Sequence, residues 1–330
     1  MITKTQNTKT SLLTCLKENR GTWISGETLS RKLDVSRAAV WKHIKTLRES
    51  GYFIESSRKK GYLFTGVLDL LLEEEILDGL DTKVFGKKKL ICLQETESTN
   101  FIAKNLAAAG APEGTLVTAE SQTSGRGRKG RTWVSPSGKG IYASMILRPH
   151  IPPDEAPKIT LLTAVAAAET LICLVKTDAK IKWPNDILIG TKKIAGILTE
   201  ISLEMDAVDY IVVGIGLNVN TQPQDIPDDL KEKATSVLIE TGRKFSRVKI
   251  LQKFLSLYEK YYDVFKNKGF RPVLARWKEL SNIVGKKICV DMINKELSGT
   301  VEDVDDDGVL ILKDSSGKIH RIFSGDITLN

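Results

Sequence analysis

Residues 116–147 of the chain read LVTAESQTSGRGRKGRTWVSPSGKGIYASMIL. Two strand-like apolar runs, 116–119 and 141–147, flank a polar loop that is dense in glycine and in cations. The residues that carry this pattern are Gln122, Gly125, Arg126, Gly127, Arg128, Lys129, Gly130, Arg131 and Trp133. Glycines allow close backbone approach and unusual dihedral angles, while arginines present planar donor forks that match carboxylate and phosphate. Because such a loop does not fold on its own, we expect an anion to complete it.

An arginine- and glycine-rich nucleic-acid-binding patch is the main alternative for this loop. Patches of that kind occur in long low-complexity tails. Here strand-like runs bound the loop on both sides. The flanking strands therefore favour a binding loop for a small anionic ligand.

Two lysine-containing motifs follow downstream. Residues 180–186 read KIKWPND, where Pro184 predicts a bend between two strands. Residues 192–198 read KKIAGIL. A structural turn would explain the proline, but it would not require a lysine on each side. Lys182 and Lys193 can both reach the negative charge that the loop gathers.

Polar residues also stand at the ends of two other predicted elements. Residues 97–100 read ESTN and precede an alanine-rich helix. Ser98 and Thr99 lie at the helix start, where capping alone would explain them, and a polar cradle for a small ligand is the functional interpretation. Residues 214–220 read GIGLNVN, in which the amide of Asn218 suits a ring or a sugar.

The N-terminal segment carries the whole formal net charge of +8. Residues 1–66 hold 13 Lys and Arg against 5 Asp and Glu, whereas residues 67–330 hold 36 of each. Apolar spacing between Gly26 and Gly51 predicts a helix, a turn and a second helix that Ser36 caps. Two short β-like runs with a basic tip follow and predict a wing. A small basic unit on a neutral body indicates a polyanion-binding module.

Eight side chains are the candidate DNA contacts of this segment. They are Ser36, Arg37, Ala38, Trp41, Lys42 and Lys45 on the second helix, and Lys59 and Lys60 on the wing. The alternative is a helical pair whose basic face makes protein contacts. The segregated charge and the basic wing favour DNA.

In this order, ESTN, GRGRKGR, KWPND, KKIAGIL and GIGLNVN resemble the catalytic domain of biotin–protein ligases. Each motif is weak alone, but five in order are specific, and they span about residues 90–220. With the predicted winged helix, the whole chain resembles the bifunctional BirA type, which joins the ligase to a repressor of the biotin operon.

The resemblance implies a multidomain α+β protein. Its parts are an N-terminal winged helix-turn-helix domain (1–66), a central mixed α/β domain of the class II synthetase and lipoate ligase type (67–280), and a small SH3-like β-barrel (281–330). It also implies two reaction steps. Biotin and ATP give biotinyl-5′-AMP, and a carrier-protein lysine then takes the biotinyl group.

Site roles follow from the resemblance residue by residue. The implied contacts of biotin and its adenylate are Ser98, Thr99, Asn100, Gln122, Gly125, Arg126, Gly127, Arg128 and Lys193. Lys182, Arg128 and Lys193 are the implied catalytic residues, and Trp133 and Asn218 are expected to contact ATP. Mg²⁺ is expected with the triphosphate. Asp186 is a candidate metal ligand, although a structural turn explains one aspartate equally well.

Beyond about Ser281 the sequence predicts short strands at 287–292, 299–304, 309–312 and 319–323. The run DVDDDG at 303–308 resembles the start of an EF-hand calcium loop. That loop requires flanking helices, whereas the flanks here are β-like. An acidic hairpin is therefore the favoured interpretation.

Other features limit the functional classes. The four cysteines have no CxxC spacing and lie far from the three histidines, so neither a zinc site nor a disulfide framework is indicated. The apolar run 159–175 contains Glu169 and fits a buried helix better than a membrane span. Residues 1–10 lack the apolar segment of a secretory signal, so we expect a cytoplasmic protein without a membrane partner.

Two rival functions remain. One is a biotin-sensing repressor without ligase activity, and the other is a lipoate-type acyltransferase. The chain has no Met-Lys-Met acceptor segment, so the expected acceptor is a separate biotin carboxyl carrier protein. Operator DNA and a second copy of the chain, forming a homodimer, are the other expected partners.

Overall fold

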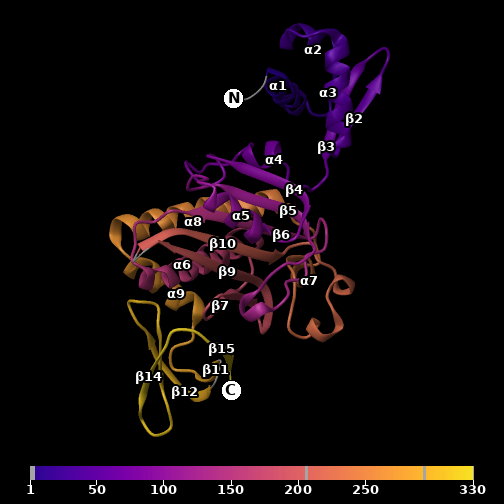
Figure 1. The fold of residues 1–330 in the computed structure, drawn as a ribbon. Coiled ribbons are helices and arrows are strands. Elements are labelled where there is room, and N and C mark those ends of the chain that lie inside the picture. Colours follow the sequence, from indigo (N-terminus) through magenta and orange to yellow (C-terminus); the bar gives the residue numbers. More distant parts are fainter. Residues whose placement is uncertain (1–3, 205–206, 293–294, 330) are drawn as a thin grey trace. The chain divides into compact units, whose positions relative to one another are not determined.

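The computed structural model describes residues 4–204, 207–292 and 295–329 (Figure 1). The chain divides into two compact units, Met1–Leu70 and Leu71–Asn330. Each unit has its own buried apolar residues, and each is described by itself.

The first unit is a winged helix-turn-helix, as predicted. Its elements are α1 (Lys4–Glu18), β1 (Trp23–Ile24), α2 (Gly26–Leu33), α3 (Arg37–Glu49), β2 (Tyr52–Ser57) and β3 (Gly61–Val67). The strands form a sheet of order β1-β3-β2. The spaced apolar residues Val40, Ile44 and Leu47 are buried, so one face of α3 packs on the core.

Local polar contacts set the helix-turn-helix geometry. The hydroxyl of Ser36 accepts a hydrogen bond from the Ala39 N–H at 3.2 Å, which confirms the predicted cap of α3. Asp34 ends α2 in the left-handed conformation, with φ 52°. Arg48 near the end of α3 donates to the carbonyl of Ile54 at 2.6 Å and so fastens the wing to the helix.

The second unit is built on a seven-stranded mixed sheet. The strand order is β4-β5-β6-β10-β9-β8-β7. The strands are β4 (Leu90–Thr96), β5 (Leu116–Gln122), β6 (Gly140–Leu147), β7 (Ala179–Lys182), β8 (Asp186–Ile189), β9 (Lys192–Glu204) and β10 (Ala207–Asn218). Only the β4–β5 pair is parallel among these described strands.

Helices cover both faces of this sheet (Figure 1). The small helix α5 (Thr99–Ala108) packs on one face, against Val117, Ile146 and Val212. The other face carries α6 (Ala156–Thr170), α8 (Arg247–Lys268) and α9 (Arg271–Ser281), with the π-helical turn Leu171–Val175. Strand residues alternate between the two faces, because successive side chains of a strand point in opposite directions. Short helices α4 (Glu73–Leu77) and α7 (Val237–Thr241) complete the layers.

The most apolar helix of the unit is a core element. Residues Pro153–Val175 are long and apolar enough to cross a membrane by length and composition alone, with a mean hydropathy of 1.8. However, 72% of that window is buried inside the protein. The predicted buried helix is thus confirmed, and Glu169 near its end pairs with Arg276 of α9 at 2.7 Å.

The C-terminal residues form a five-stranded, all-antiparallel sheet of order β14-β13-β12-β11-β15. Its strands are β11 (Lys287–Met292), β12 (Lys295–Val304), β13 (Leu310–Lys313), β14 (Ile319–Ile322) and β15 (Asp326–Leu329). The first four agree with the sequence prediction within a few residues, and β15 was not predicted. A small C-terminal β domain is confirmed.

The acidic run at 305–307 is a hairpin turn between β12 and β13. Asp305 accepts hydrogen bonds from the backbone N–H groups of Asp307 and Val309. Asp307 pairs with the buried Lys158 of α6 at 3.4 Å, and Asp306 pairs with Arg271. The hairpin interpretation was right, and these carboxylates fasten the C-terminal sheet to the helices beside it.

Candidate functional site

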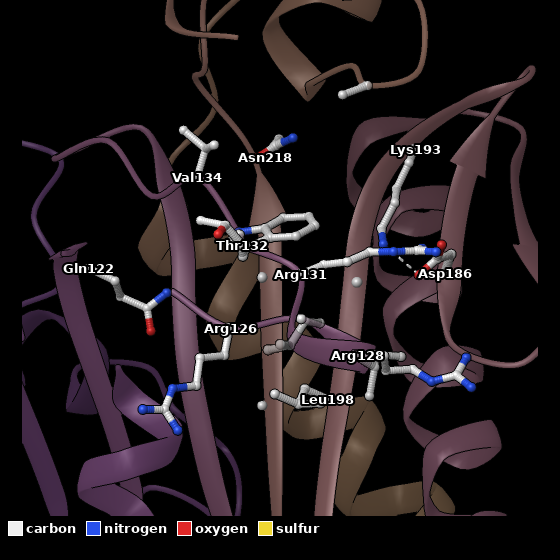
Figure 2. Close-up of a pocket in the computed structure, with 18 of the residues that line it drawn as sticks. Gln122, Arg126, Arg128, Arg131, Thr132, Val134, Asp186, Lys193, Leu198 and Asn218 are labelled. Atoms are coloured by element: carbon white, nitrogen blue, oxygen red, sulfur yellow. Dashed lines mark ion pairs between the residues drawn. The ribbon is translucent and has the colours of Figure 1, made fainter. Parts of the chain in front are cut away.

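A cavity of about 310 Å³ opens beside the ends of the central strands (Figure 2). Its walls come from the start of α5, the β5–β6 loop, strands β8, β9 and β10, the segment 221–234 and one residue of β15. The five motifs found in the sequence meet here, although they are spread over residues 97–220.

The start of α5 is tied to the loop by hydrogen bonds. Ser98 stands at the N-cap position, but its side chain makes no capping bond, so capping does not explain this residue. Thr99 donates from its backbone N–H to Gln122 Oε1 at 2.9 Å. Gln122 Nε2 in turn donates to Ser135 Oγ at 2.8 Å. These bonds hold the polar end of the cavity in one arrangement.

Asn100 uses its amide inside the protein. Its Nδ2 donates to the carbonyl of Leu198 at 3.2 Å and to Glu200 Oε2 at 2.9 Å. Its Oδ1 lies 2.6 Å from the hydroxyl of Ser144, and the amide lies so close to Gly214 that a Cβ there would collide with it. Asn100 therefore shapes the cavity wall, rather than presenting an unused amide to a ligand.

The glycine-arginine loop closes on itself. Gly127 N–H donates to the Arg131 carbonyl at 2.7 Å, and Trp133 N–H donates to the Gly125 carbonyl at 2.8 Å. Gly125 is required here, because a Cβ would lie 2.3 Å from the Trp133 carbonyl oxygen. Inside the turn, Lys129 has a positive φ of 54°.

An anion from the chain itself completes the loop. The Asp326 carboxylate lies 3.3 Å from Lys129 Nζ and 2.5 Å from Arg131. Arg128 reaches the same neighbourhood, donating to Ser324 Oγ at 2.8 Å and to Asn185 Oδ1 at 2.9 Å. The sequence predicted a ligand anion for this loop, but not that Asp326 of β15 pairs with its cations.

The charge balance at Asp326 follows from its surroundings. Burial alone would raise the pKa of its carboxyl, but Lys129, Arg131 and Arg128 outweigh burial and hold the pKa below its ordinary value. Because the pKa of Asp326 is lower in the folded protein than in the unfolded chain, its ionised carboxylate stabilises the fold at pH values above the unfolded-state pKa. This stabilisation is lost as the pH falls through the folded-state pKa. The loop contact is therefore intact at neutral pH.

The indole of Trp133 forms the middle wall. It lies on Gly196 and Gly216, two register partners on β9 and β10, and a Cβ at Gly216 would be 2.4 Å from Trp133 Cε2. Trp133 Nε1 is buried without a hydrogen-bond partner among the described residues. Lys193 Nζ sits 5.3 Å from the ring centroid.

Lys193 marks the cationic end of the cavity. Its Nζ approaches Asp186 Oδ1 to 2.7 Å as an ion pair, without the directional geometry of a hydrogen bond (Figure 2). The backbone of Lys193 also bonds to residues 233 and 235, so the end of the segment 221–234 lies beside it. Figure 2 shows Lys193 and Asp186 on the opposite side of the cavity from Gln122.

The winged-helix unit carries a second candidate surface. All eight predicted DNA contacts are exposed, and Trp41 keeps 59% of its surface accessible despite being a large apolar side chain. Two of the cations have neighbours: Lys45 lies 3.9 Å from Glu49, and Lys60 lies over the ring of Trp23.

Comparisons with known proteins match each part of the chain. Residues 8–63 match a helix-turn-helix (HTH) domain, residues 90–218 the biotin/lipoate A/B protein ligase family, and residues 285–329 the biotin protein ligase C-terminal domain. The bifunctional ligase/repressor BirA of Bacillus subtilis (strain 168) is 44% identical over 307 residues, which cover 93% of this chain and 94% of that protein. This chain belongs to the bifunctional ligase/repressor family of biotin protein ligases.

Two further comparisons agree with the ligase assignment. BirA of Escherichia coli (strain K12) is 31% identical over 310 residues, 94% of each chain. A biotin protein ligase from Aquifex aeolicus, solved in complex with biotin and ATP, matches with a TM-score of 0.63 at 30% identity. That match covers 74% of this chain and 99% of the Aquifex chain.

Most residues that the family resemblance assigned to ligands line the cavity. They are Ser98, Thr99, Asn100, Gln122, Arg126, Gly127, Arg128, Trp133, Asp186, Lys193 and Asn218. Gly125 and Lys182 are not among the lining residues. Lys182 is the register partner of Asp186 in the β7–β8 ladder, so it lies on the same face of the sheet, at the edge of the site.

Several lining residues were not predicted from the sequence. The largest group is Thr221, Asp225, Ile226, Pro227, Leu230, Lys233 and Ala234, in the segment after the last recognised motif. Asn218 Nδ2 donates to the Thr235 carbonyl at 3.0 Å and so helps to hold that segment. Asn185 of the KWPND motif was explained by a structural turn and was not a predicted site residue, yet its amide bridges Arg128 and the Ile197 carbonyl.

Proposed function

We propose that this chain is an ATP-dependent biotin–protein ligase that forms biotinyl-5′-AMP, transfers biotin to a carrier-protein lysine, and represses biotin biosynthesis genes with the adenylate as corepressor. One observation carries the enzymatic part. A single cavity joins a polar end, lined by Ser98, Thr99, Gln122 and Arg126, to a cationic end at Lys193, in a chain 44% identical to a bifunctional ligase/repressor.

The two ends of the cavity suit the two ends of biotin. The ureido ring is a neutral group of donors and acceptors, which matches the hydroxyls and amide of Ser98, Thr99 and Gln122. The valeryl chain is apolar and suits the wall made by Trp133 on its glycines. Its carboxylate would then lie toward Arg128 and Lys193.

The first reaction joins two anions, which the cations of the site offset. The biotin carboxylate oxygen forms a bond to the α-phosphorus of ATP, and pyrophosphate leaves with the electron pair of the broken P–O bond. Positioned cations stabilise the charge that gathers in this transition state. Arg128 offers a fork that Asn185 and Ser324 already orient, while Lys193 offers a compact ammonium. Lys182 at the site edge is proposed to assist activation.

The second reaction transfers the acyl group. The ε-amine of the carrier lysine attacks the carbonyl carbon of the mixed anhydride, an amide bond forms, and AMP leaves with the C–O electron pair while the amine releases a proton. The acceptor we propose is a biotin carboxyl carrier protein. The loop and the segment 221–234 would protect the anhydride by keeping water away from it.

The nucleotide contacts are proposed for Trp133 and Asn218. Both line the cavity beside the segment 221–234, and the buried Trp133 Nε1 offers a donor. The residues present do not fit a resident metal ion. Asp186 is paired with Lys193, and no group of three His, Cys, Asp or Glu in the described part of the chain could hold a metal. Mg²⁺ would arrive with the triphosphate as part of the substrate.

The assay for this function uses purified protein, biotin, Mg·ATP and a separate carrier domain. We expect pyrophosphate release and, by mass spectrometry, one biotinyl group on the carrier. Omitting ATP is the control for carried-over adenylate. Biotin binding without adenylate or transfer would overturn the ligase and leave a biotin-sensing repressor.

A second prediction concerns the slot for the Trp133 ring, which is the space left above Gly196 and Gly216 by their missing side chains. Alanine at Gly216 would push the ring into the cavity, because the new Cβ cannot fit beneath it. Overpacking costs about 1–3 kcal/mol, so we expect biotin affinity to fall about 5- to 160-fold. Isothermal titration calorimetry measures this. Gly26→Ala is the control, since a Cβ there would meet its nearest neighbour atom at 3.5 Å; an affinity of Gly216→Ala within about twofold of the parent protein would refute the slot.

The regulatory part of the proposal concerns assembly. Adenylate binding would order the loops of the cavity, favour a homodimer, and pair two winged helices on a two-fold operator. The motivation is the presence of both units in one chain. Sedimentation with and without biotin and ATP tests this, and an unchanged association state would reject it. The proposed location is the cytoplasm.

A further inference from the structure

Arg247 is a buried cation in an unfavourable place. It is the first residue of α8, where the positive end of the helix dipole disfavours another positive charge. Its side chain is 0% exposed. Burying a guanidinium is costly unless it is paired and hydrogen-bonded. Its partners explain why it is there.

Arg247 bonds to both stems of the glycine-arginine loop. Its NH2 donates to Glu120 Oε2 at 2.9 Å, and its NH1 donates to the Gly140 carbonyl at 3.1 Å. Glu120 lies near the end of β5, before the loop, and Gly140 is the first residue of β6, after it. One guanidinium therefore links the strand before the loop to the strand after it.

The Arg247 hydrogen bonds to Glu120 and Gly140 lie where the pairing of β5 with β6 ends. The last register pair of the β5–β6 ladder is Ala119 with Tyr142. Beyond it, the backbone bonds between the stems are Gly138 N–H to the Glu120 carbonyl at 3.2 Å and Gln122 N–H to the Ser135 carbonyl at 3.3 Å. The guanidinium contacts both stems at this point, and its charge-assisted bond to Glu120 is stronger than either of these long backbone bonds.

Both stems lead directly into the cavity wall. Gln122 stands two residues after Glu120 and holds Thr99. Gly140 is the register partner of Asn218 on β10. Glu120 is itself fixed on its other side, since its Oε1 accepts from the backbone N–H of Leu71 at 2.6 Å. Arg247 does not line the cavity, so any effect on ligands must pass through these stems.

We propose that Arg247 is a positioning residue that holds the two stems of the loop, residues 121–139, at the spacing the ligand site requires. The proposal rests on the ligase function for its kinetic consequences, but its structural consequence is independent of it. The rate of tryptic cleavage measures how firmly the loop is held, because trypsin cleaves after Arg126, Arg128, Lys129 and Arg131.

The test compares Arg247→Lys with Arg276→Lys. Lysine keeps the charge but loses the fork, so it cannot hold both stems. Arg276 contacts two acceptors, Glu169 and Glu279 on α6 and α9, and is 36% exposed, so its lysine variant controls for the loss of an arginine fork away from the cavity. Glu120→Gln removes the carboxylate that pairs with Arg247, so it weakens the same contact from the other partner.

For Arg247→Lys we expect faster tryptic cleavage within the loop without ligands, and kcat/KM for biotin lower by about 10- to 100-fold, as for other small misplacements of a site. Glu120→Gln should give both effects, and the double variant should add little. Arg276→Lys should give neither, even where its Tm falls equally. A Tm loss in Arg247→Lys with unchanged loop cleavage would overturn the proposal. Absence of adenylate formation by the parent protein would instead refute the ligase function, while cleavage would still decide the role of Arg247.

Discussion

Replacing Arg128 with alanine is expected to lower kcat/KM for biotin transfer by about 10²- to 10³-fold, the range seen when one oriented charge-stabilising donor is removed. The guanidinium lines the cavity, and Asn185 and Ser324 fix its direction before any ligand binds. A donor that is already oriented needs little reorganisation when the anions meet. Pyrophosphate release in a single turnover, followed by mass spectrometry of the carrier, measures the effect on each step.

Two comparisons sharpen this prediction. Arg128→Lys keeps the charge without the fork and should fall between the parent protein and Arg128→Ala. Arg271 pairs with Asp306 outside the cavity and is mostly exposed, so Arg271→Ala should leave the rate unchanged. Activity of Arg128→Ala within about threefold of the parent, with the protein folded, would show that Arg128 does not stabilise the reacting anions.

The sequence was most informative where structure depends on near neighbours. The spacing of Val40, Ile44 and Leu47 defines one helix face, and Ser36 bonds to a residue three positions away. These relations lie within one or two helical turns, so the helix-turn-helix could be predicted from the residues alone. The five motifs likewise located most of the cavity, because each keeps its polar residues within a few positions.

The contacts that could not be predicted join distant parts of the chain. The loop's anion is Asp326, which lies 195 positions after Arg131, and nothing in the sequence distinguishes it from other aspartates. The more conspicuous acidic run at 305–307 instead pairs with Lys158, Arg271 and Arg321. Charge complementarity selects a partner only after the fold has brought the charges together.

Asn100 shows the same limit at a single residue. The motif ESTN placed it in the ligand site, and it does line the cavity. Its amide, however, bonds to Leu198 and Glu200 on β9, while Ser144 on β6 contacts its oxygen. Whether a polar side chain faces a ligand or supports a wall depends on strands that the local sequence does not reveal.

Replacing both Arg37 and Lys42 with alanine is expected to weaken DNA binding by the winged-helix unit and to reduce its dependence on salt. Both side chains are exposed on α3, away from the buried face of Val40 and Ile44. Removing one cation that neutralises a phosphate should lower the slope of log Kobs against log salt by about 0.9, so the double variant should reduce the slope by up to about 2. If Arg37 also reads a base, its removal should cost a further 1–3 kcal/mol or so of sequence discrimination, about the value of one bidentate base pairing.

The measurement uses a duplex selected from a random pool by the full chain with biotin and Mg·ATP present, titrated at several salt concentrations. Lys32→Ala is the matched control, because Lys32 is a cation of the same unit that lies on α2 and pairs with Glu18 at 3.4 Å. Its removal should leave the slope unchanged. A lower slope for Arg37→Ala/Lys42→Ala with the control unaffected assigns the exposed face of α3 to DNA. Equal slopes for all three proteins would mean that the basic charge of this unit serves another partner, since a cation that neutralises a phosphate cannot be removed without changing the number of counterions released.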